Sequence, residues 1–115
     1  MVVDCIFCKI VEGTIPSKKV YESEKIVAFH DLMPVAPVHI LIIPKKHIAS
    51  ILEIEANDVE YISEIHLAVK HIAKEFGIAE DGFRVVNNCG IAGGQTVNHI
   101  HYHLIGGRNL TWPPG

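Results

Sequence analysis

The sequence predicts an α+β fold: a mainly antiparallel five-stranded sheet, one long helix packed on it and a short N-terminal helix. Three observations favour this class. One central segment has apolar residues at helical spacing, five short segments have strand character, and a three-residue linker joins the first two of these. So short a linker implies antiparallel pairing. The length of 115 residues suits one domain, so residues 1–115 are expected to form a single domain.

The first predicted element is a short helix over Phe7–Glu12, because Gly13 is a natural helix stop. Two strands follow, at Lys19–Glu22 and Ile26–His30. The polar residues 23–25 between them have the character of a turn, so the two strands are predicted to form a hairpin.

A third strand is predicted at His39–Ile43, a β-branched run that Pro44 closes. The long helix is expected to start after a cap at Asn57 or Asp58 and to stop at Gly77. Its apolar stripe consists of Val59, Ile62, Ile65, Val69, Ile72, Ala73 and Phe76.

The last two strands are predicted at Phe83–Asn87 and His99–Ile105. Successive side chains of a strand point to opposite faces, so His99, His101 and His103 are expected to share one face. The apolar residues between them are expected to pack into the core.

Three imidazoles in a row suit attack on phosphorus. A neutral ring meets less repulsion from a phosphate than an anion does, and its phosphoryl adduct is reactive enough to hydrolyse. Neighbouring rings can donate hydrogen bonds to the non-bridging oxygens. His101 has a partner on both sides, so it is the expected nucleophile. A bare metal site is the alternative interpretation, because alternating histidines also chelate.

The cysteine pattern indicates a second kind of site. Cys5 and Cys8 have the spacing of half a tetrahedral zinc site, and Cys89 stands apart. A redox pair and a reduced pair without a ligand are the alternatives, although a redox motif would be expected in a βαβ context.

Composition excludes several classes of function. The net charge of −3 gives no reason to expect nucleic-acid binding. No apolar run reaches the roughly 20 residues that span a bilayer, and the first residues lack the pattern of a secretory signal. We therefore expect a cytoplasmic protein with neither a nucleic-acid nor a membrane partner.

The segment His99-Ile100-His101-Tyr102-His103-Leu104 resembles the His-x-His-x-His signature of the histidine triad (HIT) family. The likeness extends from Ile6 to the last residue, and Trp112-Pro113-Pro114-Gly115 resembles the tail of the Hint branch. Further matching motifs are Phe29-His30-Asp31, Ala36-Pro37-Val38-His39, Ile43-Pro44-Lys45-Lys46-His47, Gly93-Gly94-Gln95-Thr96 and Gly106-Gly107-Arg108.

The resemblance implies a homodimer that binds purine nucleoside monophosphates. It also implies hydrolysis of purine nucleoside phosphoramidates and related AMP conjugates through a nucleotidyl-histidine. Two alternatives stay open: a nucleotide-binding regulatory module with little turnover, and a dinucleoside polyphosphate hydrolase. A scaffold that only binds metal would leave Asp31, Thr96 and the glycine-rich loop without a role.

Carried over by position, the resemblance gives each motif residue a role. His101 becomes the nucleophile within the triad that His99 and His103 complete, and Thr96 lies near the leaving group. The phosphate contacts implied are His103, His39, Asn88 and Gln95, and the ribose contact is Asp31, which could instead merely shape a turn. The residues implied to enclose the base are Ile6, Phe7, Ile10, Phe29, His30 and Leu32. Trp112 is implied to reach the partner's site.

The resemblance also completes the zinc site. In related zinc-binding proteins two histidines join the cysteine pair, and the matching set here is Cys5, Cys8, His47 and His99. Such a closed site is structural and would pin the N-terminus to the catalytic strand. Two positions depart from the family pattern: Asn98 replaces a frequent aromatic residue, and Thr111 replaces a common histidine.

Overall fold

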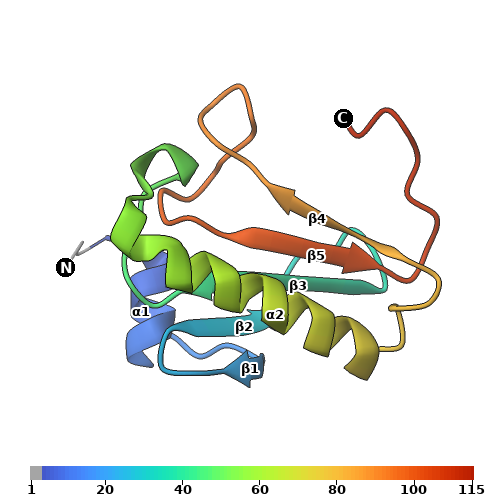
Figure 1. The fold of residues 1–115 in the computed structure, drawn as a ribbon, viewed down its shortest axis with the longest axis horizontal. Helices are drawn as coiled ribbons and strands as arrows, with labels where there is room; N and C mark the ends of the chain where they lie inside the picture. The colour runs from blue at the N-terminus through green and yellow to red at the C-terminus, as the bar shows by residue number, and fades with distance from the viewer. Residues whose placement is uncertain (1–3) are drawn as a thin grey trace.

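The computed structural model describes residues 4–115 and has a five-stranded sheet in the order β1-β2-β3-β5-β4 (Figure 1). Every pair of neighbouring strands is antiparallel, so the predicted fold class is confirmed. The strands are β1 (Lys19–Glu22), β2 (Ile26–His30), β3 (Val38–Pro44), β4 (Phe83–Asn87) and β5 (Tyr102–Gly106).

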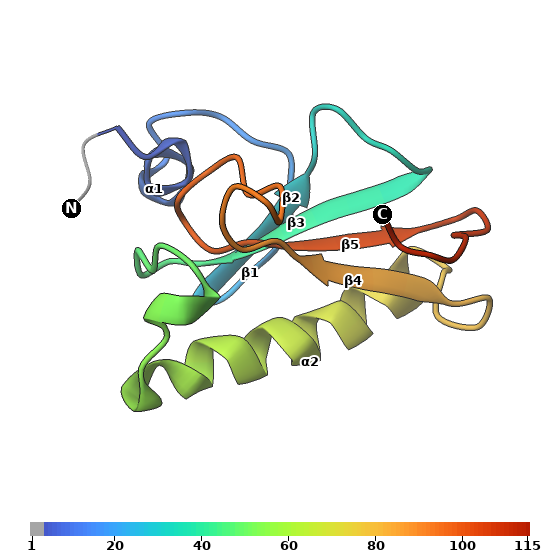
Figure 2. The same ribbon diagram turned by 90° about the horizontal axis from the view of Figure 1, so that it is seen from above.

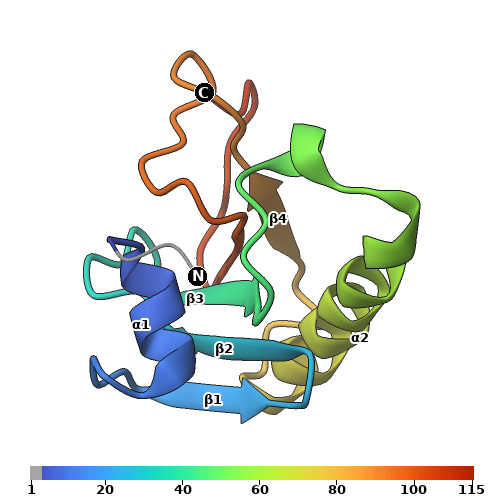
Figure 3. The same cartoon turned by 90° about the vertical axis from the view of Figure 1, so that its left-hand side faces the viewer.

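The two α-helices cover opposite faces of the sheet. Figure 2 shows α1 (Ile6–Glu12) above the strands and α2 (Val59–Glu75) below them, and Figure 3 shows the same separation. Two clusters of buried side chains match these layers, one under α2 and a smaller one under α1. Among residues 4–115, neither helix is long and apolar enough to cross a membrane.

Helix α2 begins directly after Asp58, as predicted, but not for the predicted reason. The Asp58 side chain makes no cap hydrogen bond to α2. Its buried carboxylate instead accepts from the Lys46 ammonium and from the backbone N–H of Glu55. Two short 3-10 helices, Ile51–Glu53 and Ala56–Asp58, lead into α2 and were not predicted.

The predicted last strand starts too early. Strand β5 begins at Tyr102, which pairs with Ile42 at one end of the β3–β5 ladder. Residues 99–101 therefore precede the strand. The backbone there has other partners: the N–H of Ile100 donates to the carbonyl of Ile48 at 2.6 Å, and the carbonyl of His99 accepts from the ring of His101. The alternation of faces nevertheless holds, because Ile100 packs in the cluster under α2 while His99 and His101 contact Phe7 of α1.

The C-terminal segment leaves β5 and passes beside β4 (Figure 1). The guanidinium of Arg84 on β4 donates to the carbonyls of Leu110 and Thr111, at 3.3 and 2.8 Å. These bonds anchor the segment just before Trp112, which is 81% exposed. A large aromatic side chain is thus held in solvent next to the edge strand.

Candidate active site and metal cluster

A cavity of about 410 Å³ opens on the α1 face of the sheet. Its volume falls in the range of small-molecule sites, roughly 300–1,000 Å³. The residues that line it are Ile6, Phe7, Ile10, Ile15, Pro16, Ser17, Lys18, Phe29, His30, Asp31, Leu32, Met33, Leu41, Thr96, Val97, His101 and His103. Many of these side chains are apolar, and three histidines and a carboxylate are among the polar ones.

Phe7 joins the apolar wall to the histidines. Its ring meets Phe29 edge-on, with ring centroids 5.8 Å apart. It meets His101 in the same manner at 5.1 Å. Phe7 is buried, so these contacts hold the His101 ring against a side chain that has little freedom to move.

The hydrogen bonds of His101 fix its tautomer. Its Nδ1 lies 2.9 Å from the carbonyl oxygen of His99. A carbonyl oxygen only accepts, so the ring must donate its Nδ1 proton there, which leaves the lone pair of a neutral ring on Nε2. His101 therefore has a nucleophilic nitrogen on a ring that lines the cavity.

A chain of hydrogen bonds likewise fixes the rings of His39 and His103. The backbone N–H of Val35 donates to His39 Nδ1 at 3.1 Å, so the proton of the neutral ring is on Nε2. That Nε2 donates to His103 Nδ1 at 2.9 Å. His103 must then carry its own proton on Nε2, which makes it a hydrogen-bond donor beside His101.

Both rings of this chain are neutral near pH 7. Burial, and to a smaller extent the neighbouring His101 and His39 rings, lower the pKa of His103 to about 4. Burial also lowers the pKa of His39, although Asp31 acts in the opposite direction. The tautomers derived above therefore describe these two rings at physiological pH.

Asp31 takes part both in a turn and in the cavity. One carboxylate oxygen, Oδ1, accepts the backbone N–H of Met33 at 2.8 Å, and Oδ2 lies 3.3 Å from His39 Nε2. Each oxygen offers two lone pairs, so the carboxylate keeps capacity to accept from hydroxyl groups. Asp31, His39 and His103 also bring potential metal-binding atoms together. Because His39 Nε2 carries a proton, this arrangement favours a hydrogen-bond chain over a metal site.

Gln95 holds a loop and lies outside the cavity lining. Its Nε2 donates to the carbonyls of Ala49 and Val97, at 2.7 and 3.0 Å, and its Oε1 accepts the N–H of Gly90 at 3.0 Å. The amide is therefore engaged within the protein. These bonds fix the backbone on both sides of Thr96, which lines the cavity.

A second group of four residues gathers at the start of α1. The donor atoms of Cys5, Cys8, His47 and His99 all lie within 4.8 Å of one another. The Nδ1 of His99 is 3.4 Å from the Sγ of Cys5 and 3.5 Å from that of Cys8, and His47 Nδ1 is 3.3 Å from Cys8 Sγ. Donors around a tetrahedral zinc ion are separated by about 3.3 to 3.8 Å, so these distances fit such an ion.

The chemistry of the donors fits a metal as well. His99 Nε2 donates to the carbonyl of Pro44 at 2.8 Å, which leaves the lone pair on Nδ1, facing the sulfurs. Burial lowers the pKa of His99 to about 4, so the ring is neutral. Burial and the adjacent Cys5 raise the pKa of the Cys8 thiol to about 11. Two buried thiolates would thus require a cation beside them.

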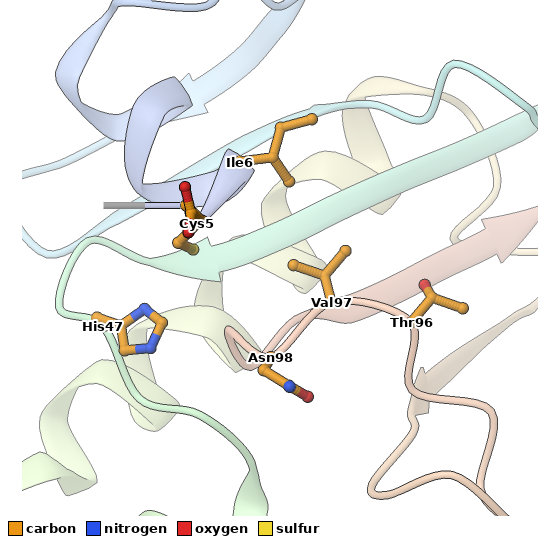
Figure 4. Close-up of a pocket in the computed structure, with 7 residues that line it drawn as sticks. Cys5, Ile6, His47, Thr96, Val97 and Asn98 are labelled. Carbon is orange, nitrogen blue, oxygen red and sulfur yellow. The ribbon is translucent and has the colours of Figure 1, made fainter. Parts of the chain in front are cut away.

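A second cavity of about 350 Å³ lies between this cluster and the first cavity (Figure 4). Figure 4 shows Cys5 and His47 on one side of it and Thr96 and Val97 on the other. The two cavities share Ile6, Thr96 and Val97 as lining residues. Asn98, one of the two departures from the family pattern, also lines the second cavity.

The predicted site residues fall into three groups. Lining the first cavity are Ile6, Phe7, Ile10, Phe29, His30, Asp31, Leu32, Thr96, His101 and His103. The predicted metal ligands meet in the second cluster. The third group does not line the cavity: His39 is hydrogen-bonded to His103 behind it, and Asn88, Gln95 and Trp112 lie outside the lining.

Several lining residues were not predicted: Ile15, Pro16, Ser17, Lys18, Met33, Leu41 and Val97. Leu41 could have been found from strand alternation, because it follows His39 by two residues on β3. Asn87 was also missed, and its side chain donates to the carbonyl of His101 at 3.0 Å. The segment 15–18 has no motif that would have indicated its position.

Comparison with known proteins gives consistent matches. The family model for the HIT domain matches residues 12–110. The 14 kDa zinc-binding protein of Zea mays is 48% identical over 112 residues, which cover 96% of this chain and 87% of that protein. A HIT family hydrolase from Legionella pneumophila superposes with a TM-score of 0.95 at 50% identity, covering 97% of this chain and 100% of that chain. A histidine triad nucleotide-binding protein from Candida albicans gives a TM-score of 0.83 at 38% identity, covering 96% and 83%.

Proposed function

Because the chain belongs to the HIT domain family, we propose that it is a nucleotide-binding hydrolase of purine nucleoside phosphoramidates and related AMP conjugates. Its solved relatives include one named as a hydrolase and one named as nucleotide-binding. The observation that carries the proposal is the tautomer of His101, which has its Nδ1 proton on a carbonyl and its Nε2 lone pair free.

The reaction would run in two displacements. The lone pair of His101 Nε2 attacks the α-phosphorus, a phosphorus–nitrogen bond to the ring forms, and the bond to the leaving amine breaks. The amine takes a proton from solvent. Water then attacks the same phosphorus and releases a proton to solvent, the bond to the ring breaks, and the nucleoside monophosphate departs with His101 neutral again. The carbonyl of His99 accepts from Nδ1, so it stabilises the positive ring of the intermediate.

His103 would stabilise charge on the phosphate. Its Nε2 proton is held in place by the His39 hydrogen bond to the other ring nitrogen. A neutral donor fixed in advance can bond a non-bridging oxygen as negative charge develops, without reorganising at that moment. His39 is in this interpretation a positioning residue, fixed in turn by the backbone of Val35.

The rest of the nucleotide would follow the cavity. The apolar wall of Ile6, Phe7 and Phe29 suits the faces of a purine, and the free lone pairs of Asp31 suit the two ribose hydroxyls. Thr96 lines both cavities, so we infer that a leaving group would extend past it toward the second cavity.

We also propose that Cys5, Cys8, His47 and His99 hold a structural zinc ion, as the name of the Zea mays relative suggests for that protein. Two thiolates and two imidazoles form a closed set of ligands. Zinc would supply the charge that keeps both thiols deprotonated. The site needs reduced cysteines, which suits the proposed cytoplasmic location.

A homodimer completes the proposal. Strand β4 is an edge of the sheet in the described residues, and Phe83 and Val85 on it are each 38% exposed. Trp112 is exposed in the segment that Arg84 anchors beside the same strand. Apolar side chains along an unpaired edge suit a second copy of this chain.

Release of amine from adenosine 5′-phosphoramidate tests the proposed reaction. We expect His101→Ala to lower kcat by at least about 1,000-fold, because the step that needs a nucleophile is lost. The matched control is His66→Ala, which removes an exposed histidine of α2. Mass spectrometry of wild-type protein quenched and kept at alkaline pH, where the phosphorus–nitrogen bond to histidine is stable, should detect a nucleotidyl adduct on His101.

Equal turnover by wild type and His101→Ala would contradict the assignment of the nucleophile. Binding of AMP without turnover by the wild-type protein would instead favour a nucleotide-binding module.

A further inference from the structure

Ser17 carries an unsatisfied hydrogen-bonding group at the first cavity. Among the buried side-chain nitrogen and oxygen atoms of residues 4–115, the Ser17 hydroxyl oxygen alone has no hydrogen-bond partner. Buried polar atoms in folded proteins nearly always have one, and exceptions often mark functional positions. Ser17 also lines the cavity in which the nucleotide is proposed to bind.

Hydrogen bonds hold the backbone around Ser17 in place, so the position of this side chain in the cavity wall is fixed. The N–H of His30 donates to the carbonyl of Lys18 at 3.0 Å, and Lys19 pairs with Phe29 in the sheet. The hydroxyl keeps one degree of freedom, rotation about the Cα–Cβ bond, which can turn it toward the cavity.

The surroundings of Ser17 indicate which part of a ligand it would meet. The neighbouring wall includes Ile10, Ile15 and Phe29, which offer no side-chain hydrogen bond. A purine has apolar faces and a polar edge, so its faces match this wall while its edge needs a polar partner. His101, His103 and Asp31 stand at the part of the cavity assigned above to phosphate and ribose, and the other polar side chains of the lining are Lys18, His30 and Thr96.

We propose that Ser17 is a specificity-determining residue whose hydroxyl bonds one polar group on the edge of the purine. This inference rests on the proposed nucleotide site but not on turnover. A serine hydroxyl both donates and accepts, so its partner is a ring nitrogen or the group at C6. Binding of the correct base then satisfies a hydroxyl that is otherwise buried without a partner.

The test removes the Ser17 hydroxyl from the protein and, separately, each polar group from the purine edge of the ligand. Calorimetry measures AMP and four analogues, the 1-deaza, 3-deaza, 7-deaza and 6-unsubstituted purine nucleotides, on wild type and Ser17→Ala. We expect Ser17→Ala to weaken AMP binding about 5- to 10-fold. One analogue, the one that lacks the contacted group, should bind both proteins equally. The exposed α2 residue provides the control Ser63→Ala, which should bind like wild type.

A second measurement on Ser17→Ala is its thermal stability without ligand, which is not expected to fall although the affinity for AMP does. Removal of a buried unpaired hydroxyl should not destabilise the ligand-free protein, so the melting temperature of Ser17→Ala is expected to stay equal or rise, by up to about 4 °C. Unchanged AMP affinity, an equal loss for all five ligands, or no binding of AMP by wild type would overturn the inference. Failure to hydrolyse phosphoramidates with the expected binding pattern intact would overturn only the proposed reaction.

Discussion

At the scale of single residues, hydrogen bonds decide what each histidine can do. His99 and His101 have equivalent side chains two positions apart, yet their reactive nitrogens differ. His99 gives its Nε2 proton to Pro44 and keeps its lone pair on Nδ1, whereas His101 gives its Nδ1 proton to a carbonyl and keeps its lone pair on Nε2. One ring is therefore suited to a metal beside the cysteines, and the other to a nucleophile at the cavity.

The low pKa of His103 predicts a loss of stability in acid. The ring is neutral in the folded protein down to about pH 4, whereas an unfolded histidine binds a proton near pH 6.5. The contribution of His103 is therefore complete above pH 6.5 and is lost as the pH falls from 6.5 to 4. At about 1.4 kcal/mol per pKa unit, the loss reaches at most about 3 kcal/mol.

Urea unfolding of wild type and His103→Gln at pH 7.5, 6, 5 and 4 measures this contribution. We expect the free energy of unfolding to fall more steeply for wild type, since glutamine does not titrate. Acid effects on the proposed metal cluster are common to both proteins, whereas any effect of pH on His39 is coupled to His103 by their hydrogen bond and forms part of the measured difference. Parallel pH profiles would show that the environment of His103 does not disfavour its charged form.

At the scale of elements, the loop that precedes residues 99–101 depends on one side chain. The three hydrogen bonds of Gln95 join this loop to Ala49 and to Val97. We expect Gln95→Ala to lower the free energy of unfolding by about 2–3 kcal/mol, because each bond contributes roughly 1 kcal/mol. Urea unfolding measures this, with Gln95→Glu as the comparison because it keeps the acceptor and removes both donated bonds. A stability within 0.5 kcal/mol of wild type, by the rough size of surface substitutions, would contradict this role.

Helix α1 depends on the proposed metal in a similar way. The first turn is attached to the rest of the molecule at Cys5 and Cys8, and Cys5 also caps the helix by accepting from the N–H of Cys8. We expect Cys8→Ser to lose bound zinc and more than about 3 kcal/mol of stability. Elemental analysis and thermal unfolding check both. Cys89→Ser is the control, because Cys89 lies outside the cluster. Wild-type protein with no zinc after reconstitution would contradict the site.

How far the sequence predicts these elements depends on the range of the interactions that form them. The boundaries of β1, β2 and β4 follow from local residue patterns and are confirmed. The predicted start of β5 is wrong because the backbone hydrogen-bond partners of residues 99–101 include distant residues such as Ile48. The lack of a hydrogen-bond partner for the Ser17 hydroxyl likewise cannot be predicted from the sequence, since it depends on how the segment 15–18 packs against β2.

At the scale of the whole molecule, the exposed edge predicts the assembly. We expect the protein to sediment as a dimer at micromolar concentration and Val85→Asp to sediment as a monomer, because a charge on the edge strand opposes burial against a second copy. Leu52→Asp is the matched control, because Leu52 is an exposed apolar residue outside the sheet, in the 3-10 helix Ile51–Glu53. A wild-type monomer, or a dimer that survives Val85→Asp, would contradict an interface at β4.

Helix α1 serves both sites, and this constrains how the segment can change over time. Cys5 and Cys8 are three residues apart and face the metal cluster, while Phe7 and Ile10 have the same spacing and face the cavity. Each residue advances an α-helix by about 100°, so the angle between the side chains of the two sets is fixed by their separation in the sequence. The two sets alternate along the chain, so one residue inserted or deleted between Cys5 and Ile10 would change the spacing within at least one set and turn part of it away from its target. We therefore expect a protein with one residue inserted or deleted between Cys5 and Ile10 to lose part of at least one of the two candidate sites.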